Sequence, residues 1–171
     1  SSLSEGLAQK FPMIVSYVAK GVDNPGATAR LSFGTDGFHG VVFYAGQSSF
    51  YIDPYTKDYS SYIVYNRSNL PQKEQEFRCD VTEQLDKKKT GNSPQRNAND
   101  GLLRTFRLAL VCSGEYAQFH LDDQDISSNA SDEVKKAAVL SAMNTSMTRV
   151  NGVFEKDLGV RMEIVANNDE I

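Results

Sequence analysis

Apolar residues recur every three or four positions over a long stretch after Ser131, and this is the period of an α-helix. Ser131 is a favourable N-cap residue, and Asp132 and Glu133 suit the first turn that follows it. Gly159 is typical of the position just after a helix ends. The sequence therefore predicts a helix from about residue 132 to residue 158. Its apolar stripe consists of Leu140, Met143, Met147, Val150, Phe154 and Leu158.

Strand patterns lie on both sides of this helix. The segment 103–112 ends in an apolar run, from Leu108 to Cys112, that is typical of a strand buried on both faces. After the helix, apolar and charged residues alternate over 160–164, as in a second strand. Residues 103–171 are therefore expected to form a right-handed βαβ unit, the opening unit of an open-sheet α/β domain without its remainder.

The first part of the chain has shorter patterns. Leu3, Leu7 and Phe11 have helical spacing, so a short helix is expected to end at Pro12. Apolar segments separated by turn signals then predict an antiparallel sheet. The expected strands are 28–33, 38–44, 50–52, 61–65 and 76–81. The fold class that follows is α+β, with a β-rich antiparallel region before the βαβ unit.

A polar segment, 82–102, separates these two regions. It has few apolar side chains and is rich in Gly, Pro, Ser, Asn and Lys. This composition predicts a linker, and hence a boundary between residues 1–81 and 103–171. Proteolytic nicking concentrates in such exposed segments, so a processing site is expected at its basic residues. These are Lys87, Lys88, Lys89 and Arg96. A passive tether is the alternative interpretation.

Composition and charge argue against two classes of binding partner. Hydrophobic residues make up 40% of the chain and charged residues 23%, so it is expected to fold rather than stay disordered. The net charge of −4 argues against a nucleic-acid partner, because such proteins usually have a clustered basic face. No apolar run approaches the ~20 residues that span a bilayer, so no membrane partner is expected.

Catalytic motifs are largely absent from the sequence. It has no Gly-rich phosphate loop, no Gly-x-Ser-x-Gly and no His-Glu-x-x-His. His39 and His120 fall in different regions, whereas a catalytic zinc usually needs three converging protein ligands. Both histidines are therefore expected to be structural. Asp122, Asp123 and Asp125 lack the Gly and the distal Glu of a calcium-binding EF-hand, so a solvated turn is expected there.

Several segments nevertheless carry a resemblance to a known family. EYAQFH (115–120), AMNTSMTRVNGVFEKDL (142–158) and VANNDEI (165–171) resemble the start of the catalytic domain of bacterial reprolysin-like zinc metallopeptidases. These are metzincins related to the adamalysins. DNPGAT (23–28), GFHG (37–40) and YIDPYTKD (51–58) resemble the pro-region of the same proteins. The resemblance implies that the chain combines part of a pro-region with the first, incomplete part of a catalytic domain.

The same resemblance implies a function for the full-length protein. It would be a secreted zinc-dependent endopeptidase that acts on proteins or peptides, with a pro-region that assists folding and keeps the enzyme latent. The family's zinc motif, His-Glu-x-x-His-x-x-Gly-x-x-His, would lie beyond Ile171, so zinc would be bound outside this chain. The residues present here are then expected to be inert alone. Their partner would be the remainder of their own catalytic domain, and cutting within 82–102 would separate the two parts.

One cysteine is a candidate for latency. Latent metzincins often block zinc with a thiolate of the pro-region, which excludes the catalytic water. Cys79 would be that ligand, and the neighbouring Arg78 could hold it by pairing with an acidic group. Two alternatives stay open for Cys79, namely a buried strand thiol and a disulfide with Cys112. Cys112 itself is most simply a packed core residue.

A rival hypothesis assigns the chain to another class. It would be a secreted β-rich binding module whose ligand is a protein or a glycan. The side chains that would bind this ligand are Tyr44, Tyr51, Tyr55, Tyr59 and Tyr62. Tyrosines at such positions more often pack against neighbouring strands of a sheet.

Overall fold

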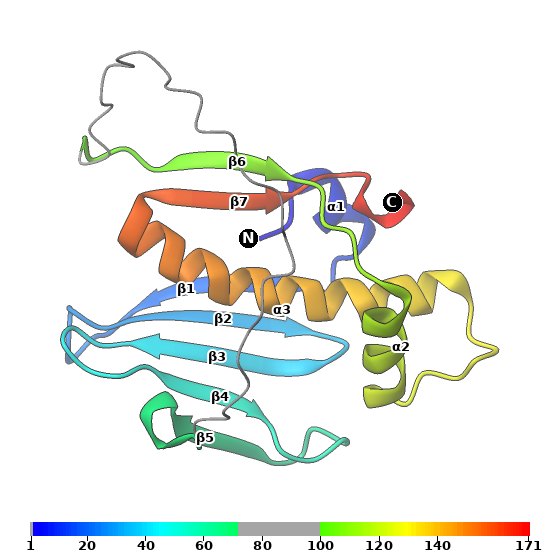
Figure 1. Cartoon of the computed structure of the whole chain (residues 1–171), viewed down its shortest axis with the longest axis horizontal. Helices are drawn as coiled ribbons and strands as arrows, with labels where there is room; N and C mark the ends of the chain where they lie inside the picture. The colour runs from blue at the N-terminus through cyan, green and yellow to red at the C-terminus, as the bar shows by residue number, and fades with distance from the viewer. Residues whose placement is uncertain (1, 72–99) are drawn as a thin grey trace, which may run out of the picture.

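Helix α3 (Asp132–Leu158) lies between two sheets in the computed structural model, which describes residues 2–71 and 100–171 (Figure 1). The side chain of Ser131 accepts a hydrogen bond from the N–H of Val134 at the start of the helix. Gly159 ends it in the left-handed conformation, with φ of 63°. The predicted helix and both of its ends are therefore confirmed.

An antiparallel sheet covers one side of α3. Its five strands follow one another in sequence order, and each pairs with the next. They are β1 (Val15–Lys20), β2 (Thr28–Gly34), β3 (Gly37–Phe43), β4 (Phe50–Pro54) and β5 (Tyr62–Asn66), after which the short helix η1 (Arg67–Asn69) follows. The four strands predicted between residues 28 and 65 are confirmed, whereas β1 was not predicted. The strand predicted at 76–81 lies outside the described residues.

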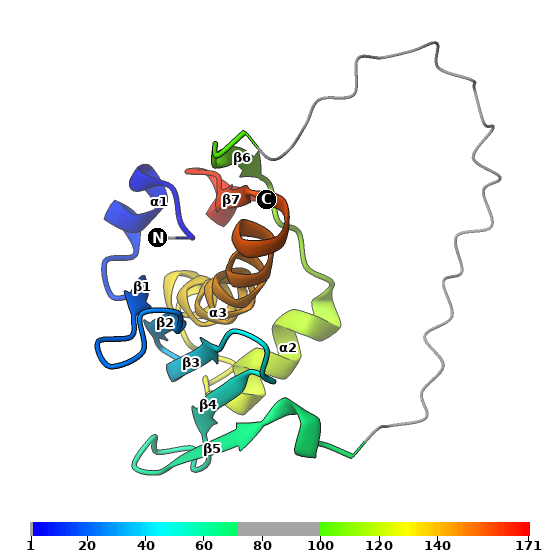
Figure 2. The same cartoon turned by 90° about the vertical axis from the view of Figure 1, so that its left-hand side faces the viewer.

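A parallel pair of strands lies on the other side of α3 (Figures 1 and 2). β6 (Arg104–Leu108) pairs with β7 (Val160–Ile164), and α2 (Gly114–Asp123) stands between β6 and α3 in the chain. The expectation of a strand over 103–112 buried on both faces is wrong. β6 ends at Leu108, and Phe106 within it is 53% exposed. Its only paired strand among the described residues is β7, which leaves one edge of β6 open.

The N-terminal segment completes this second sheet. The N–H of Ser4 donates to the carbonyl of Ile164 at 3.0 Å, and the N–H of Ile164 donates to the carbonyl of Ser2 at 2.9 Å. Helix α1 (Glu5–Lys10) follows directly and ends before Pro12, as the spacing of its apolar residues predicts. At the other end of the chain, the short helix η2 (Asn168–Glu170) follows β7.

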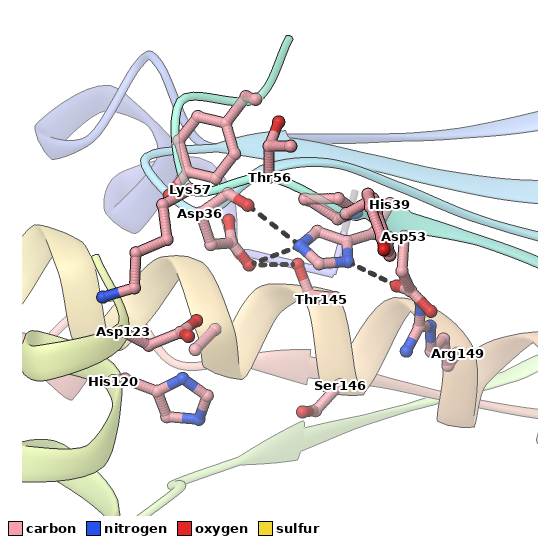
Figure 3. Close-up of a pocket in the computed structure, with 14 residues that line it drawn as sticks. Asp36, His39, Asp53, Thr56, Lys57, His120, Asp123, Thr145, Ser146 and Arg149 are labelled. Carbon is pink, nitrogen blue, oxygen red and sulfur yellow. Dashed lines mark hydrogen bonds and ion pairs between the residues drawn. The ribbon is translucent and has the colours of Figure 1, made fainter. Parts of the chain in front are cut away.

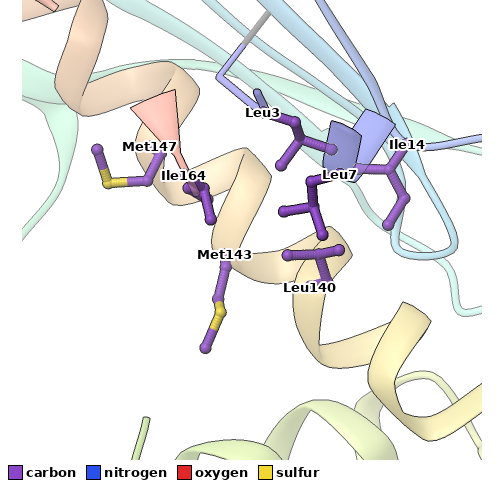
Figure 4. Packing of buried hydrophobic residues seen from close by; sticks show 7 residues of the cluster. All are labelled: Leu3, Leu7, Ile14, Leu140, Met143, Met147 and Ile164. Carbon is purple, nitrogen blue, oxygen red and sulfur yellow. The ribbon is translucent and has the colours of Figure 1, made fainter. Parts of the chain in front are cut away.

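One hydrophobic core joins the residues before and after the predicted linker (Figure 4). Its buried members are Leu3, Leu7, Ile14, Leu140, Met143, Met147 and Ile164. The first three come from the N-terminal segment, and the others come from α3 and β7. The architecture is a mixed arrangement of helices and sheets, consistent with the predicted α+β class.

Helix α3 also buries a second face that the apolar stripe does not include. Small and polar residues on this face lie against the antiparallel sheet. They include Ser141, Thr145, Thr148 and Gly152. The three polar residues among them are each at most 7% exposed. The apolar stripe, in contrast, is less buried toward the C-terminal end of α3, where Leu158 is 53% exposed. Within residues 2–71 and 100–171, no helix has both the length and the apolar character needed to cross a membrane.

Candidate functional site

A pocket of about 350 Å³ opens where the ends of the antiparallel sheet meet α2 and α3 (Figure 3). Most of the charged side chains around it come from segments far apart in the sequence. Its polar lining includes Asp36, His39, Asp53, Lys57, His120, Asp123, Thr145 and Arg149. This pocket is therefore the place where the structure gathers ionisable groups.

The hairpin between β2 and β3 brings the first of these groups onto α3. Gly37 has φ of 89°, which favours glycine, and allows the tight turn just after Asp36. Gly34 lies so close to α3 that a Cβ there would overlap the hydroxyl of Ser141. The close approach places the carboxylate of Asp36, which is 8% exposed, directly on the helix.

His39 is held between two carboxylates (Figure 3). Its Nδ1 lies 2.7 Å from Oδ1 of Asp53 on β4. Its Nε2 lies 3.0 Å from the backbone carbonyl of Asp36 and 3.3 Å from Oδ2 of the same residue. Because both ring nitrogens face acceptors, the imidazole is best placed as a cation that donates from both.

The pKa values follow from this arrangement. Burial alone would lower the pKa of His39, but its hydrogen bonds to Asp36 and Asp53 and their charges outweigh burial and raise the pKa to about 9. Burial raises the pKa of each carboxyl, yet the bonds from His39 and from neighbouring donors leave the pKa of Asp36 and of Asp53 below its ordinary value. At neutral pH the cluster therefore contains one cation between two anions.

Both carboxylates also bond to other elements. Asp36 accepts hydrogen bonds from the hydroxyls of Ser141 and Thr145 on α3, the second at 2.8 Å. Asp53 pairs with the guanidinium of Arg149 on α3 and accepts a bond from the hydroxyl of Tyr65 at 2.7 Å. The burial and the charge of Asp53 raise the pKa of Tyr65 to about 12, so Tyr65 stays a donor. The network thus ties β3, β4 and β5 to one helix.

Helix α2 forms the remaining wall of the pocket. Lys57, from the loop after β4, pairs with Asp125 at 3.0 Å and donates to the carbonyl of Asp122 at 3.4 Å. Asp122 and Asp123 are the last residues of α2, and Asp125 follows just beyond. Burial lowers the pKa of His120, whose ring lies edge-on to Tyr116 at 4.4 Å between centroids. His120 is therefore a neutral packing residue, as predicted.

A second ionic cluster lies farther along α3. Glu155 pairs with Arg30 on β2 and with Arg161 on β7, the latter at 2.7 Å. The side chains of Arg30 and Glu155 are each 12% exposed. Burial raises the pKa of Glu155, but its two arginine partners lower it overall. One carboxylate therefore links both sheets through the helix between them.

Most polar atoms of these groups are paired with one another, although the buried Nε of Arg149 has no hydrogen-bond partner. Among the described residues, no group of three or more His, Cys, Asp or Glu side chains is arranged to hold a metal ion. A histidine that donates from both nitrogens has no lone pair for a metal or a proton. The bonds of this network hold the antiparallel sheet against α3.

The candidate residues from the sequence fall mostly outside this site. Cys79, Lys87, Lys88, Lys89 and Arg96 all lie in 72–99, outside the described residues. Cys112 is a free thiol, half-buried against the hydrophobic core, as expected of a packing residue. Because Cys112 is free, it does not form the alternative disulfide in this structure, whereas the zinc ligation and processing hypotheses stay predictions.

The tyrosines of the rival hypothesis do not share one surface. Tyr51 lies on the side of the sheet that faces α3, where the guanidinium of Arg149 stands 5.3 Å from its ring centroid. Tyr62 contacts Phe38 on the opposite face, at 5.9 Å between ring centroids. Tyr55 is 73% exposed in a loop, and Tyr59 lines the pocket.

The sequence pattern did not predict that Asp36, Asp53 and Arg149 belong to one network. A signal for it was present in α3, because Ser141, Thr145, Thr148 and Gly152 recur at intervals of four, three and four residues. This is a second helical stripe, made of small and polar residues, and it indicates a second buried face. The chain matches no protein-family model, no curated protein and no solved structure.

Proposed function

We propose that this chain is the pro-region and the N-terminal catalytic segment of a secreted zinc-dependent endopeptidase of the reprolysin-like metzincins. The antiparallel sheet belongs to the pro-region, and β6, α3 and β7 form the opening βαβ unit of the catalytic domain. The pro-region assists folding and keeps the enzyme latent until the chain is cut within 82–102. The observation that carries this proposal is the ionic and hydrogen-bonded contact between the sheet and α3.

The contact between the sheet and α3 is rich in ion pairs and hydrogen bonds, which suits a pro-region that later separates from the enzyme. The sheet meets α3 through the pairs Arg30–Glu155 and Asp53–Arg149 and through hydroxyl bonds such as Ser32–Thr145 at 3.1 Å. Interfaces between parts that separate are more polar than permanent cores. While the linker is intact, the effective concentration of the sheet at α3 is on the order of millimolar. Cutting the linker removes that advantage, so the two parts can then separate as the cut protein is diluted.

The hydrophobic core supports the folding role. Leu3, Leu7 and Ile14 are at most 3% exposed, and they pack against the apolar face of α3 and against Ile164 of β7. The unit of β6, α3 and β7 would expose this face if it stood alone. The N-terminal segment also supplies the backbone hydrogen bonds to Ile164 that a bare strand edge would lack.

The described residues do not themselves fit a zinc ion, since they contain no converging set of ligands. The proposal therefore places the zinc and the chemistry of peptide cleavage in residues outside this chain. Cys79 stays the candidate latency ligand within the pro-region. Protein or peptide substrates would reach the enzyme only after the pro-region leaves.

The proposal is tested on the precursor encoded by the same reading frame continued past Ile171. We expect it to contain zinc and to cleave no peptide until limited trypsin treatment, after which activity appears with a new N-terminus within 82–102. Chelation of the metal should abolish that activity, and residues 1–171 alone should be inert. A continuation without His-Glu-x-x-His, or a precursor without zinc, would contradict the proposal.

A pair of variants tests the contact between the sheet and α3, on which the proposed function rests. Arg149→Met breaks the pair with Asp53, so the precursor should show raised activity before trypsin treatment. Arg107→Met is the matched control, because Arg107 is exposed on β6. Activity after full processing should be similar in both variants. Equal basal activity in the two precursors would show that the sheet does not maintain latency through this pair.

A further inference from the structure

The antiparallel sheet has its charged face toward α3 and its apolar face outward, which is the reverse of most antiparallel sheets. An antiparallel sheet usually covers its apolar face and leaves the polar one in water. Here all the charged strand residues, Lys20, Arg30, His39 and Asp53, alternate onto the face toward α3. The opposite face, called the outer face below, has no covering element among residues 2–71 and 100–171 (Figure 2).

The outer face carries a ladder of aromatic contacts. Phe33 lies 4.7 Å from Phe38, and Phe38 lies 5.9 Å from Tyr62, between ring centroids. Tyr17 meets Phe33 edge-on at 6.1 Å. The ladder thus runs from β1 to β5, and three of its members stay exposed: Tyr17 at 55%, Phe33 at 41% and Tyr62 at 41%.

The rows beside the ladder are also free of charge. The register places Tyr17, Leu31, Gly40, Ile52 and Val64 opposite one another across all five strands. Val64, at the end of this row, is 64% exposed. The next row runs from Ala19 to Asn66, and that asparagine is its single polar side chain. Within residues 2–71 and 100–171 this apolar surface is continuous and uncovered, which normally marks an interaction site.

We propose that the outer face is an interface whose occupant is a second copy of this chain, packed sheet against sheet. A charged partner would find no complementary group on this face. Two copies of it, related by a two-fold axis, bring no like charges together even though the whole chain has a net charge of −4. Sheets with apolar faces stack at about 10 Å, which lets the aromatic ladders interdigitate.

The size of the surface fits a weak, reversible dimer. Strands about 5 Å apart and residue rows about 7 Å apart give this five-stranded face roughly 500 Å². Two copies then bury on the order of 1,000 Å², which reaches the lower limit of specific interfaces. This proposal is independent of the peptidase function, because it concerns the face away from α3.

The test measures the mass of residues 1–171 in solution by sedimentation over a range of concentrations. We expect a dimer, twice the chain mass of 18.9 kDa, that dissociates on dilution. Val64→Lys should raise the dimer dissociation constant at least about tenfold, because it buries an unpaired ammonium group on each side. Val111→Lys is the matched control, since Val111 is 70% exposed beyond β6 and away from the outer face. It should leave the dissociation constant unchanged.

Each outcome of this experiment either supports or contradicts the proposed dimer. A wild-type chain that stays monomeric at every concentration overturns it and leaves the outer face to another occupant. A dimer that Val64→Lys does not weaken, or that Val111→Lys weakens equally, places the interface elsewhere. Tyr17→Lys, on the opposite edge of the same row, is a second variant with the same expectation as Val64→Lys, and circular dichroism verifies that each variant is folded.

Discussion

His39 bridges the two carboxylates through which this part of the sheet contacts α3. It stands between Asp36 and Asp53, and those carboxylates in turn reach Ser141, Thr145 and Arg149 on α3. Removing one partner from such a buried network leaves an uncompensated charge, which destabilises more than the pair itself stabilises. The cluster therefore fixes how the sheet sits on the helix, and it makes the contact sensitive to pH.

Stability should fall as the pH rises from about 6.5 to about 9. In this window the folded chain holds a proton on His39 that the unfolded chain has already lost, because folding raises the pKa from 6.5 to about 9. The stabilisation is complete below pH 6.5 and is lost as the pH passes about 9. It amounts to up to about 3 kcal/mol. Urea unfolding at a series of pH values measures it.

His39→Gln is the control for this prediction. Glutamine keeps a hydrogen-bonding side chain but has no charge, so the decrease between pH 6.5 and 9 should disappear. The variant should also be less stable than the wild type at pH 6.5, where Asp36 and Asp53 lose their shared cation. An unchanged slope would mean that His39 is neutral in the folded chain.

At the scale of single elements, local signals predicted α3 well. Its cap residues and its apolar stripe lie within the helix or next to it, so the sequence contains everything needed to place both ends. β1 was missed because one of its faces mixes Ser16, Val18 and Lys20, which blurs the alternation of polar and apolar residues, and because β1 depends on β2 for pairing. β6 was misplaced because its apolar run, beyond Leu108, leads toward α2 instead of into a buried sheet.

The polar site was harder to predict than the elements. Asp36, Asp53 and Arg149 lie far apart in the chain, and the two that form an ion pair, Asp53 and Arg149, are 96 positions apart. Nothing local links them, since their contact requires the hairpin of β2 and β3 to rest on α3. The sequence nevertheless contains one requirement for this contact. It is the set of small residues on α3, which allow the hairpin of β2 and β3 to approach the helix closely.

Gly152 tests this requirement for close approach. A Cβ at Gly152 would lie 2.7 Å from the ring of Phe43 and 2.9 Å from the side chain of Arg30. Gly152→Ala should therefore destabilise the chain, because overpacking of about 1–3 kcal/mol exceeds the roughly 1 kcal/mol that alanine gains in a helix. The free energy of unfolding from urea titration measures the difference.

Gly114 in α2 provides the matched control. Among the described residues, nothing lies within 4 Å of a Cβ built there. Gly114→Ala should leave stability unchanged or raise it by up to about 1 kcal/mol. If Gly152→Ala were equally neutral, the sheet would have to sit farther from α3 than it does here.

At the scale of the whole molecule, the regions on either side of 82–102 share one core. Leu3, Leu7 and Ile14 lie against Leu140 and Ile164, so neither region can unfold without exposing the other. Once the proposed outer-face dimer is dissociated, by dilution or by Val64→Lys, a chain of this kind should unfold in a single transition that does not depend on protein concentration.

Cutting the chain within 82–102 should change that behaviour without separating the parts at high concentration. The fragments would stay together through the shared core, but their unfolding would become a dissociation, so the urea midpoint should rise with protein concentration. Limited trypsin treatment of the Val64→Lys chain, in which the outer-face dimer is weakened, followed by unfolding at several concentrations, measures this. Leu3→Asp places a charge in the core, so its cut form should separate at once. A midpoint that stays constant after cutting would mean that each region is stable alone, and the pro-region would then be a separate domain with no part in completing the core of its neighbour.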